Sequence, residues 1–159
     1  MAKKGGSQMS QKIQKYPSWY PKQSVVNTDT VMYGYATAID GDSAVAIKKA
    51  VKWAKSQLQS SLSDKLENIR SDAARELGSD SGLDSPSFLL ALRKADSAIK
   101  YLAETGKTDV KTVEGYNSYR SFAEIMVPKD ELIDRIGKRL GGHEKAWNAM
   151  KNSMAFKNF

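Results

Sequence analysis

The sequence predicts an α+β fold, in which a small antiparallel sheet of about three strands packs on one long helix. Two observations support this prediction: residues 42–77 have the apolar spacing of one helix, and residues 31–38 and 110–127 have the alternation of strands. We expect a helical hairpin to project from this body and an extended arm to leave it at each end. The expected division is a basic and aromatic N-terminal arm at 1–24, a core domain at 25–140, and an aromatic C-terminal tail at 141–159.

The long helix is the element around which the rest of the chain is arranged. Its large apolar residues recur at intervals of three, four or their sums, at Ile47, Val51, Leu58, Leu62, Leu66, Ile69 and Leu77. Asp42 or Ser43 is suited to cap its first turn, and Gly78 to end it. At 1.5 Å per residue the helix would be roughly 50 Å long. We therefore expect its far half to be buried against a second helix or another subunit.

The sheet is predicted from two stretches. Residues 31–38 place Tyr33 and Tyr35 on one face of a strand and Met32 and Gly34 on the other. The glycine indicates either a bulge or a close crossing by the long helix. Residues 110–127 predict a hairpin that turns at positions 117–118.

A second helix is expected to begin at Ser85 and Pro86 and to run to about Glu104, where Gly106 stops it. Its apolar seam consists of Phe88, Leu92, Ala95, Ile99 and Leu102. The short connection predicts that this helix folds back antiparallel along the far half of the first. A further short helix is expected over residues 130–140.

Aromatic side chains gather in both ends of the chain. Tyr16, Trp19 and Tyr20 flank two prolines near the N-terminus, and they would pack either on their own domain or into a neighbouring subunit. The last residues are too apolar to remain in solvent, so the tail either packs back on the domain or docks into a partner groove. The predicted partner-binding residues are Tyr16, Trp19, Tyr20, Trp147, Met150, Phe156 and Phe159.

The net charge of +7 is concentrated near the N-terminus. Lys3, Lys4, Lys12, Lys15 and Lys22 all precede the first acidic residue, Asp29. Such an arm suits an acidic protein neighbour, nucleic acid or an anionic membrane, or it remains solvated. Protein contact is the first choice. Nucleic acid is the second, with these lysines as the contacts.

Tyrosines of the sheet are a second possible nucleic-acid contact. Tyr33, Tyr35, Tyr116 and Tyr119 could offer a platform on which bases stack. No basic-aromatic motif of an RNA-binding sheet accompanies them, so side chains of the protein core remain the simpler interpretation.

The sequence offers few catalytic groups. It contains one histidine, His143, and no cysteine, and no phosphate-binding glycine motif or nucleophile elbow occurs. We therefore predict that the protein is not an enzyme and needs no cofactor or metal. No apolar run approaches the ~20 residues of a membrane span, and no apolar stretch follows the basic start as in a signal peptide.

Several motifs together resemble the lipoprotein-20 family, which includes flagellar basal-disk lipoproteins and is similar to the N-terminal part of flagellar assembly protein T. The matching segments lie at 17–20 (Pro-Ser-Trp-Tyr), 33–38 (Tyr-Gly-Tyr-Ala-Thr-Ala), 43–50 and 119–140. The resemblance implies a structural protein of rings or disks without catalytic residues. The chain departs from the family pattern because it has no lipid-bearing cysteine and no export signal.

From these observations we expect a non-enzymatic structural subunit of a large assembly, joined by its terminal arms to its own copies or to other structural proteins. A phage virion, at the capsid, neck or tail, is the leading setting, with assembly in the host cytoplasm; otherwise the protein would be cytoplasmic. The alternative is a basic nucleic-acid-binding protein that uses the N-terminal arm.

Overall fold

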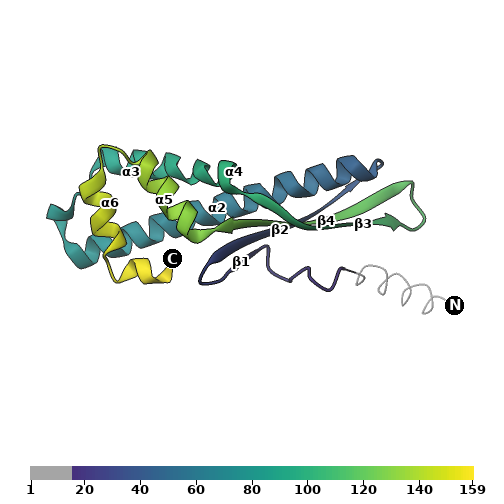
Figure 1. Ribbon diagram of the computed structural model, residues 1–159, viewed down its shortest axis with the longest axis horizontal. Coiled ribbons are helices and arrows are strands. Elements are labelled where there is room, and N and C mark those ends of the chain that lie inside the picture. The colour runs from purple at the N-terminus through teal and green to yellow at the C-terminus, as the bar shows by residue number, and fades with distance from the viewer. Residues whose placement is uncertain (1–15) are drawn as a thin grey trace.

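A single long helix, α2 (Ser43–Leu77), lies along one face of an antiparallel sheet in the computed structural model, which describes residues 16–159 (Figure 1). The sheet contains, in spatial order, β1 (Val25–Asn27), β2 (Val31–Asp40), β4 (Ser118–Pro128) and β3 (Glu104–Val113). The predicted α+β fold is therefore confirmed. The sheet has four strands rather than about three, because residues 25–27 add a short edge strand.

Both ends of α2 are set by the predicted residues. The Val45 N–H donates a hydrogen bond to the Asp42 carboxylate at 3.1 Å, so Asp42 is the N-cap. Gly78 follows the last turn with a φ of 82°, a conformation that favours glycine, and its N–H donates to the Ala74 carbonyl. The helix is continuous over the 35 residues between these two caps.

The first half of α2 lies unusually close to the sheet, because small side chains line the contact. The buried residues there are Ala46, Ala50 and Ala54 of the helix and Gly34, Ala36, Ala38 and Ala123 of the sheet. A Cβ atom on Gly34 would lie only 2.7 Å from the Ala54 carbonyl oxygen and 2.8 Å from a Leu58 methyl carbon. Gly34 therefore marks a close crossing by the long helix, one of the two predicted alternatives.

One buried hydroxyl group joins the helix to the sheet at the same contact. The Ser121 Oγ atom of β4 lies 2.6 Å from the Ala46 carbonyl oxygen and 3.2 Å from that of Ala38. Ser121 is fully buried, so this hydrogen bond is made away from water. The contact fixes where along the sheet the helix begins.

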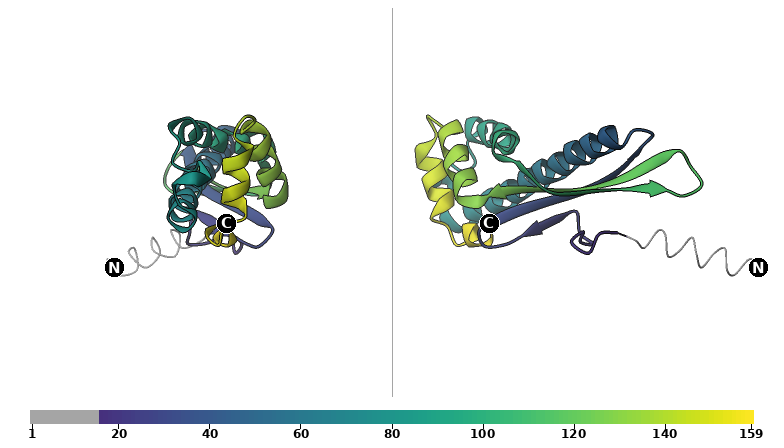
Figure 2. Two further views of the ribbon diagram at one scale, coloured as in Figure 1. Left: turned by 90° about the vertical axis from the view of Figure 1, so that its left-hand side faces the viewer. Right: turned by 45° about the vertical axis from the view of Figure 1, so that its right-hand side comes forward.

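The second half of α2 belongs to a larger core, which is closed by helices. α3 (Pro86–Ala95) runs back along α2 as predicted, and α5 (Lys129–Arg139) and α6 (Glu144–Lys151) complete this end of the molecule (Figures 1 and 2). Its fully buried side chains include Leu58, Leu62, Leu66, Phe88, Ile99, Leu132 and Ile136. The predicted helical hairpin of α2 and α3 is thus covered by α5 and α6. The first half of α2 and the β3–β4 hairpin form the thinner end (Figure 2).

The second helix ends earlier than predicted. α3 stops at Ala95 and is followed by the 3-10 turn η2 (Asp96–Ala98) and the short helix α4 (Ile99–Leu102), and β3 begins at Glu104. Helical backbone therefore continues to Leu102, close to the predicted end near residue 104, whereas the predicted start of the hairpin at residue 110 is wrong because β3 already begins at Glu104. Pairing with β4 prevails here: Thr105 opposes Ile125, and a register shift between Thr105 and Thr108 places Gly106 in a bulge.

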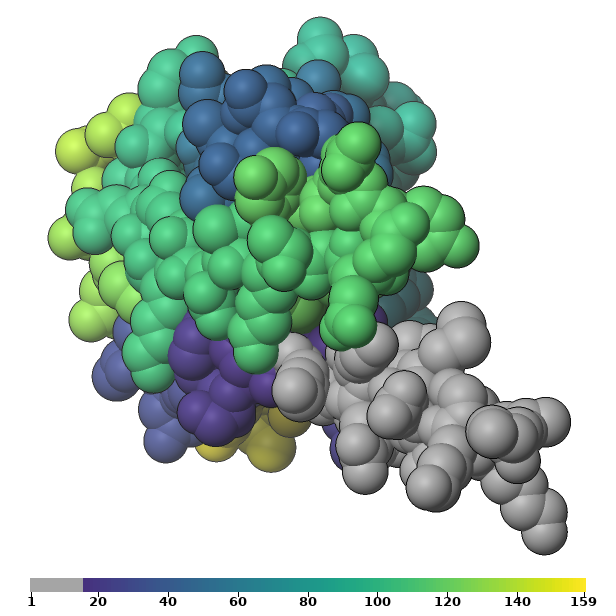
Figure 3. Space-filling model, turned by 90° about the vertical axis from the view of Figure 1, so that its right-hand side faces the viewer, coloured from purple at the N-terminus to yellow at the C-terminus, as the bar shows by residue number. Residues whose placement is uncertain are grey.

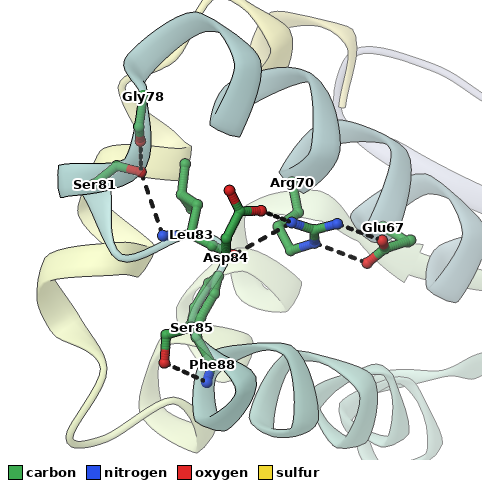
Figure 4. Close-up of polar contacts among 8 residues, drawn as sticks. All are labelled: Glu67, Arg70, Gly78, Ser81, Leu83, Asp84, Ser85 and Phe88. Atoms are coloured by element: carbon green, nitrogen blue, oxygen red, sulfur yellow. Dashed lines mark hydrogen bonds and ion pairs between the residues drawn. The ribbon is translucent and has the colours of Figure 1, made fainter.

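Arg70 holds the loop that connects α2 to α3 (Figure 4). Its guanidinium group donates to both oxygens of Glu67, at 3.0 and 2.6 Å, to the Asp84 carboxylate at 3.0 Å and to the Leu83 carbonyl at 3.3 Å. Arg70 is only 8% exposed, although it is charged. Two of these four hydrogen bonds, to Leu83 and Asp84, hold the loop that leads to the Ser85 cap of α3.

Replacement of Gly34 by alanine tests the close crossing of helix and sheet. We expect Gly34→Ala to lower the free energy of unfolding by roughly 1–3 kcal/mol, because the new Cβ overlaps a backbone oxygen that moves only if the helix moves. Urea unfolding followed by circular dichroism measures the change. Gly41→Ala is the matched control, since its Cβ would meet only the Asn117 oxygen at 3.7 Å. Equal stability of the two variants would contradict the proposed packing constraint.

Candidate functional site

An aromatic cluster covers the face of the sheet that points away from α2. It comprises Tyr16, Trp19 and Tyr20 of the N-terminal segment, Tyr33 and Tyr35 of β2, and Phe122 of β4. Side chains alternate along a strand, so these sheet residues lie opposite the alanines that meet α2. The segment before β1 crosses this face and places its rings on it.

The rings meet edge to face. Tyr16 and Tyr20 lie 5.0 and 5.4 Å from Phe122 between ring centroids, and Tyr20 lies 5.9 Å from Tyr35. A turn orients the segment, in which the Tyr20 N–H donates to the Pro17 carbonyl at 3.0 Å and Pro17 is buried. Of the two alternatives for this segment, the structure shows the packing on its own domain.

The aromatic side chains at the start of this segment are only partly buried. Tyr16 is 40% exposed, and Trp19 and Tyr20 are half-buried. Trp19 contacts Tyr20 at 6.1 Å between ring centroids, and no other ring of residues 16–159 reaches it. The cluster therefore combines a buried base, formed by Tyr35 and Phe122, with an outer layer that retains accessible aromatic surface.

A buried carboxylate lies beside the base of the cluster. Glu124 of β4 accepts a hydrogen bond from the Tyr35 hydroxyl at 2.8 Å and from the Lys107 N–H at 3.3 Å. A side chain at Gly106 would collide with this carboxylate, which explains the glycine in the bulge. Burial, and then the hydrogen bond to Glu124, raise the pKa of Tyr35, so the ring keeps its proton and remains a donor.

The tyrosine platform considered for base stacking is not present. Tyr33 and Tyr35 stack on each other at 6.3 Å, but Tyr35 is buried under the N-terminal segment. Tyr119 opposes Asp40 and therefore lies on the other face of the sheet, and Tyr116 is 75% exposed at the hairpin turn. Four rings that alternate between faces cannot form one surface. That interpretation is wrong, because it counted the tyrosines without their register.

The C-terminal residues pack into the main core of the same chain. Trp147 is 4% exposed, Met150 is fully buried, and Phe159 stacks on the half-buried Phe156 at 5.3 Å. Of the two alternatives for this tail, the structure shows packing back on the domain. Trp147, Met150 and Phe159 are therefore not free to act as anchors for a partner. Their burial against α2 and α5 replaces the separate tail that was expected at 141–159.

Two polar contacts fasten this C-terminal region. The buried Lys129 ammonium group donates to the Phe159 carbonyl oxygen at 2.7 Å, and burial lowers the pKa of Lys129. The Met154 N–H donates to the Glu76 carboxylate, with both oxygens at 3.0 Å. Sequence reasoning missed both, because they join positions that are far apart along the chain.

The remaining candidate residues fall into three groups. Lys3, Lys4, Lys12 and Lys15 lie outside the described residues, and Lys22 is exposed. His143 stands before α6, 6.0 Å from the Phe88 ring, and its side chain caps no helix N–H. Within residues 16–159, no three His, Cys, Asp or Glu side chains gather closely enough to hold a metal ion.

Comparisons with family models, curated proteins and solved structures give no match for this chain. The resemblance to the lipoprotein-20 family therefore stays a prediction. No helix within residues 16–159 has the length and apolar character needed to cross a membrane.

The hydrogen bond between Tyr35 and Glu124 predicts a loss of stability at alkaline pH. As pH rises above about 10, the unfolded chain releases the Tyr35 proton while the folded chain retains it, so the free energy of unfolding falls with pH. Below that pH the contribution of this group is constant. Tyr35→Phe should reduce the slope above pH 10 by up to about 1.4 kcal/mol per pH unit. Urea unfolding between pH 8 and 11 measures it, with Tyr116→Phe at the exposed turn as the control.

Truncation of a buried ring tests whether the C-terminal region belongs to the core. We expect Trp147→Ala to lower the free energy of unfolding by about 3–5 kcal/mol, because a buried side chain is lost and a cavity is left. Met154→Ala, at a position that is 65% exposed, should change it by no more than about 0.5 kcal/mol. Thermal or urea unfolding measures both. A Trp147→Ala variant as stable as the Met154→Ala variant would contradict the packing described.

Proposed function

We propose that this chain is a non-enzymatic structural subunit of a large multi-subunit assembly, namely a phage virion, at its capsid, neck or tail. The observation that carries the proposal is the half-covered aromatic surface of Tyr16, Trp19 and Tyr20. Large rings that are only partly buried in the free chain gain stabilisation when a neighbour covers them, and buried aromatic side chains commonly dominate interface energies.

The location of this surface also supports the proposal. The rings follow directly after the basic residues 1–15, and the β1 strand that succeeds them belongs to the sheet. A neighbour that binds the rings would therefore be linked through a few residues to a rigid body. The close contact of α2 with the sheet supplies that rigidity, because close-packed interiors transmit force with little deformation.

The proposed anchors are fewer than the sequence predicted. Tyr16, Trp19 and Tyr20 remain, and the exposed Lys22 beside them can meet an acidic neighbour. The buried residues of the C-terminal region are omitted. Phe156 is half-buried and contacts Trp147 at 5.8 Å, so it is at most the edge of a contact surface.

The resemblance to a family of ring- and disk-forming structural proteins supports the same class of function. Two of the four segments that carry it, at 17–20 and 33–38, touch each other in this chain through Tyr20 and Tyr35. Placement in a virion rests on the combination of that resemblance with partly exposed aromatic rings that a neighbouring subunit would cover.

Removal of the accessible rings tests the proposal. We expect the purified chain to form oligomers and the Tyr16→Ala/Trp19→Ala variant to remain a folded monomer, because the neighbour loses its aromatic contact. Sedimentation velocity or mass photometry measures the mass, and circular dichroism checks the fold. Tyr116→Ala, which removes an exposed ring from the hairpin turn, is the matched control and should still assemble. A variant that assembles like the unmodified chain, or an unmodified chain that is monomeric at every concentration, would refute the proposal.

Nucleic-acid binding through the N-terminal arm is the second candidate function. It is favoured by the exposed Lys22, which stands next to the accessible rings of Trp19 and Tyr20. Replacement of Lys3, Lys4, Lys12, Lys15 and Lys22 by glutamine should then abolish salt-dependent retention of an oligonucleotide. Retention that is unchanged in this variant would exclude the arm as the contact.

A further inference from the structure

Positive charge in the described part of the chain is concentrated on one half of one helix. Residues 16–159 contain 21 basic and 18 acidic side chains. Four of the basic side chains are Lys48, Lys49, Lys52 and Lys55, and without them the same residues hold 17 basic and 18 acidic groups. The first acidic residue within α2 is Asp64, so about 20 residues of helix carry lysine alone.

Three of these lysines have no ionic partner among residues 16–159. Lys49 forms an ion pair with Asp40 at 2.5 Å, which neutralises it within the chain. Lys48, Lys52 and Lys55 form no ion pair with any residue of the described chain. Lys48 and Lys52 are exposed, and Lys55 is half-buried. Intervals of four and three residues place the three on one side of the helix, over about 10 Å of its length.

An exposed aromatic ring accompanies the lysines. Trp53 is 49% exposed, and its ring contacts no other ring and no cation of residues 16–159. The alanines that meet the sheet occupy the side of the helix opposite these three lysines, and Trp53 lies on the flank between the two sides, about 100° around the helix axis from Lys52. The end-on view shows this half of α2 (blue) at the surface beside the β3–β4 hairpin (green), with no helix over it (Figure 3).

We propose that this surface, the basic face of α2 formed by Lys48, Lys52 and Lys55 with Trp53 on its flank, binds single-stranded nucleic acid. The three unpaired ammonium groups neutralise backbone phosphates, and the accessible indole stacks on an unpaired base. A membrane surface is less favoured, because Val45 and Trp53 are the only large apolar side chains exposed on this half of the helix. The inference concerns a different surface from the assembly contact and does not depend on it.

The acidic groups around this face do not cancel it. Asp42 is the N-cap of α2 and accepts the Val45 N–H, and Asp40 is paired with Lys49. Both lie at the first turn, before Lys52 and Lys55. The next carboxylate along the helix, Asp64, stands nine residues beyond Lys55, about 13 Å along the axis. Asp96 of η2 lies nearer, because its carboxylate is 3.5 Å from the Gln59 amide one turn beyond Lys55, but it forms no ion pair with the lysines of this face.

Binding of a fluorescein-labelled 20-nucleotide DNA strand to the full-length chain, followed by anisotropy at several salt concentrations, tests the proposal. We expect Lys48→Glu/Lys52→Glu/Lys55→Glu to weaken binding at least tenfold and to reduce the slope of log affinity against log salt by about 2, because three phosphate contacts are lost. Trp53→Ala should weaken binding by about tenfold with an unchanged salt slope, because stacking involves no ion release.

Two control variants locate the contact. Lys94→Glu/Lys145→Glu/Lys157→Glu makes the same change in net charge at exposed lysines elsewhere and should retain most of the affinity. Replacement of the five N-terminal lysines by glutamine should leave the dependence on Lys48, Lys52 and Lys55 intact. Circular dichroism confirms that each variant is folded.

Several outcomes would overturn the proposal. The first is that the DNA strand does not bind at 50 mM salt. The second is that the control with Lys94, Lys145 and Lys157 replaced loses as much affinity as the α2 variant. The third is that affinity is lost only when the N-terminal lysines are replaced. Binding to phosphatidylserine vesicles that depends on the α2 lysines, without binding of the DNA strand, would assign the face to a membrane instead. The mass of the assembled protein is measured separately, so failure here leaves the assembly proposal standing.

Discussion

The contact between the first half of α2 and the sheet determines how the molecule is arranged. Gly34 and the alanines around it let a helix lie against a strand at a distance that no larger side chain permits. This thin layer buries little apolar area on each residue, so the stability of the fold depends on the helical end, where leucine, isoleucine and aromatic side chains fill the core. The long helix passes through both regions and fixes how they are oriented relative to each other.

A division of roles follows from this arrangement. The helical end contains the large buried side chains and encloses the C-terminal rings. The thin end leaves one side of α2 and the outer aromatic layer of the sheet accessible. The surfaces proposed for contact both lie where packing is shallow, so substitutions there change binding with little effect on the core.

Local sequence patterns predicted the long helix, its capping residue and the glycine that ends it. They also predicted the two faces of β2 and the β4 strand. Asp42 and Gly78 each form hydrogen bonds to residues within one turn of the helix. The alternation of side chains along β2 is likewise a local property that does not depend on distant residues. The start of β3 at Glu104 did not follow, because its pairing with β4 depends on residues such as Ile125 that are distant along the chain. The site was harder to predict: whether Tyr16 or Trp147 is accessible depends on partners such as Phe122 and Gly137, which come from other elements.

The bulge in β3 has a consequence for crowded conditions. β3 is a long strand at the edge of the sheet, and such an edge invites an incoming chain to extend the sheet. The register shift at Gly106 interrupts its regular run, and Lys107, Asp109 and Lys111 place charge along the strand. Copies held at high local concentration are thereby discouraged from fusing strand to strand. They remain free to meet through discrete side chains, which allows a reversible lattice instead of a fibril.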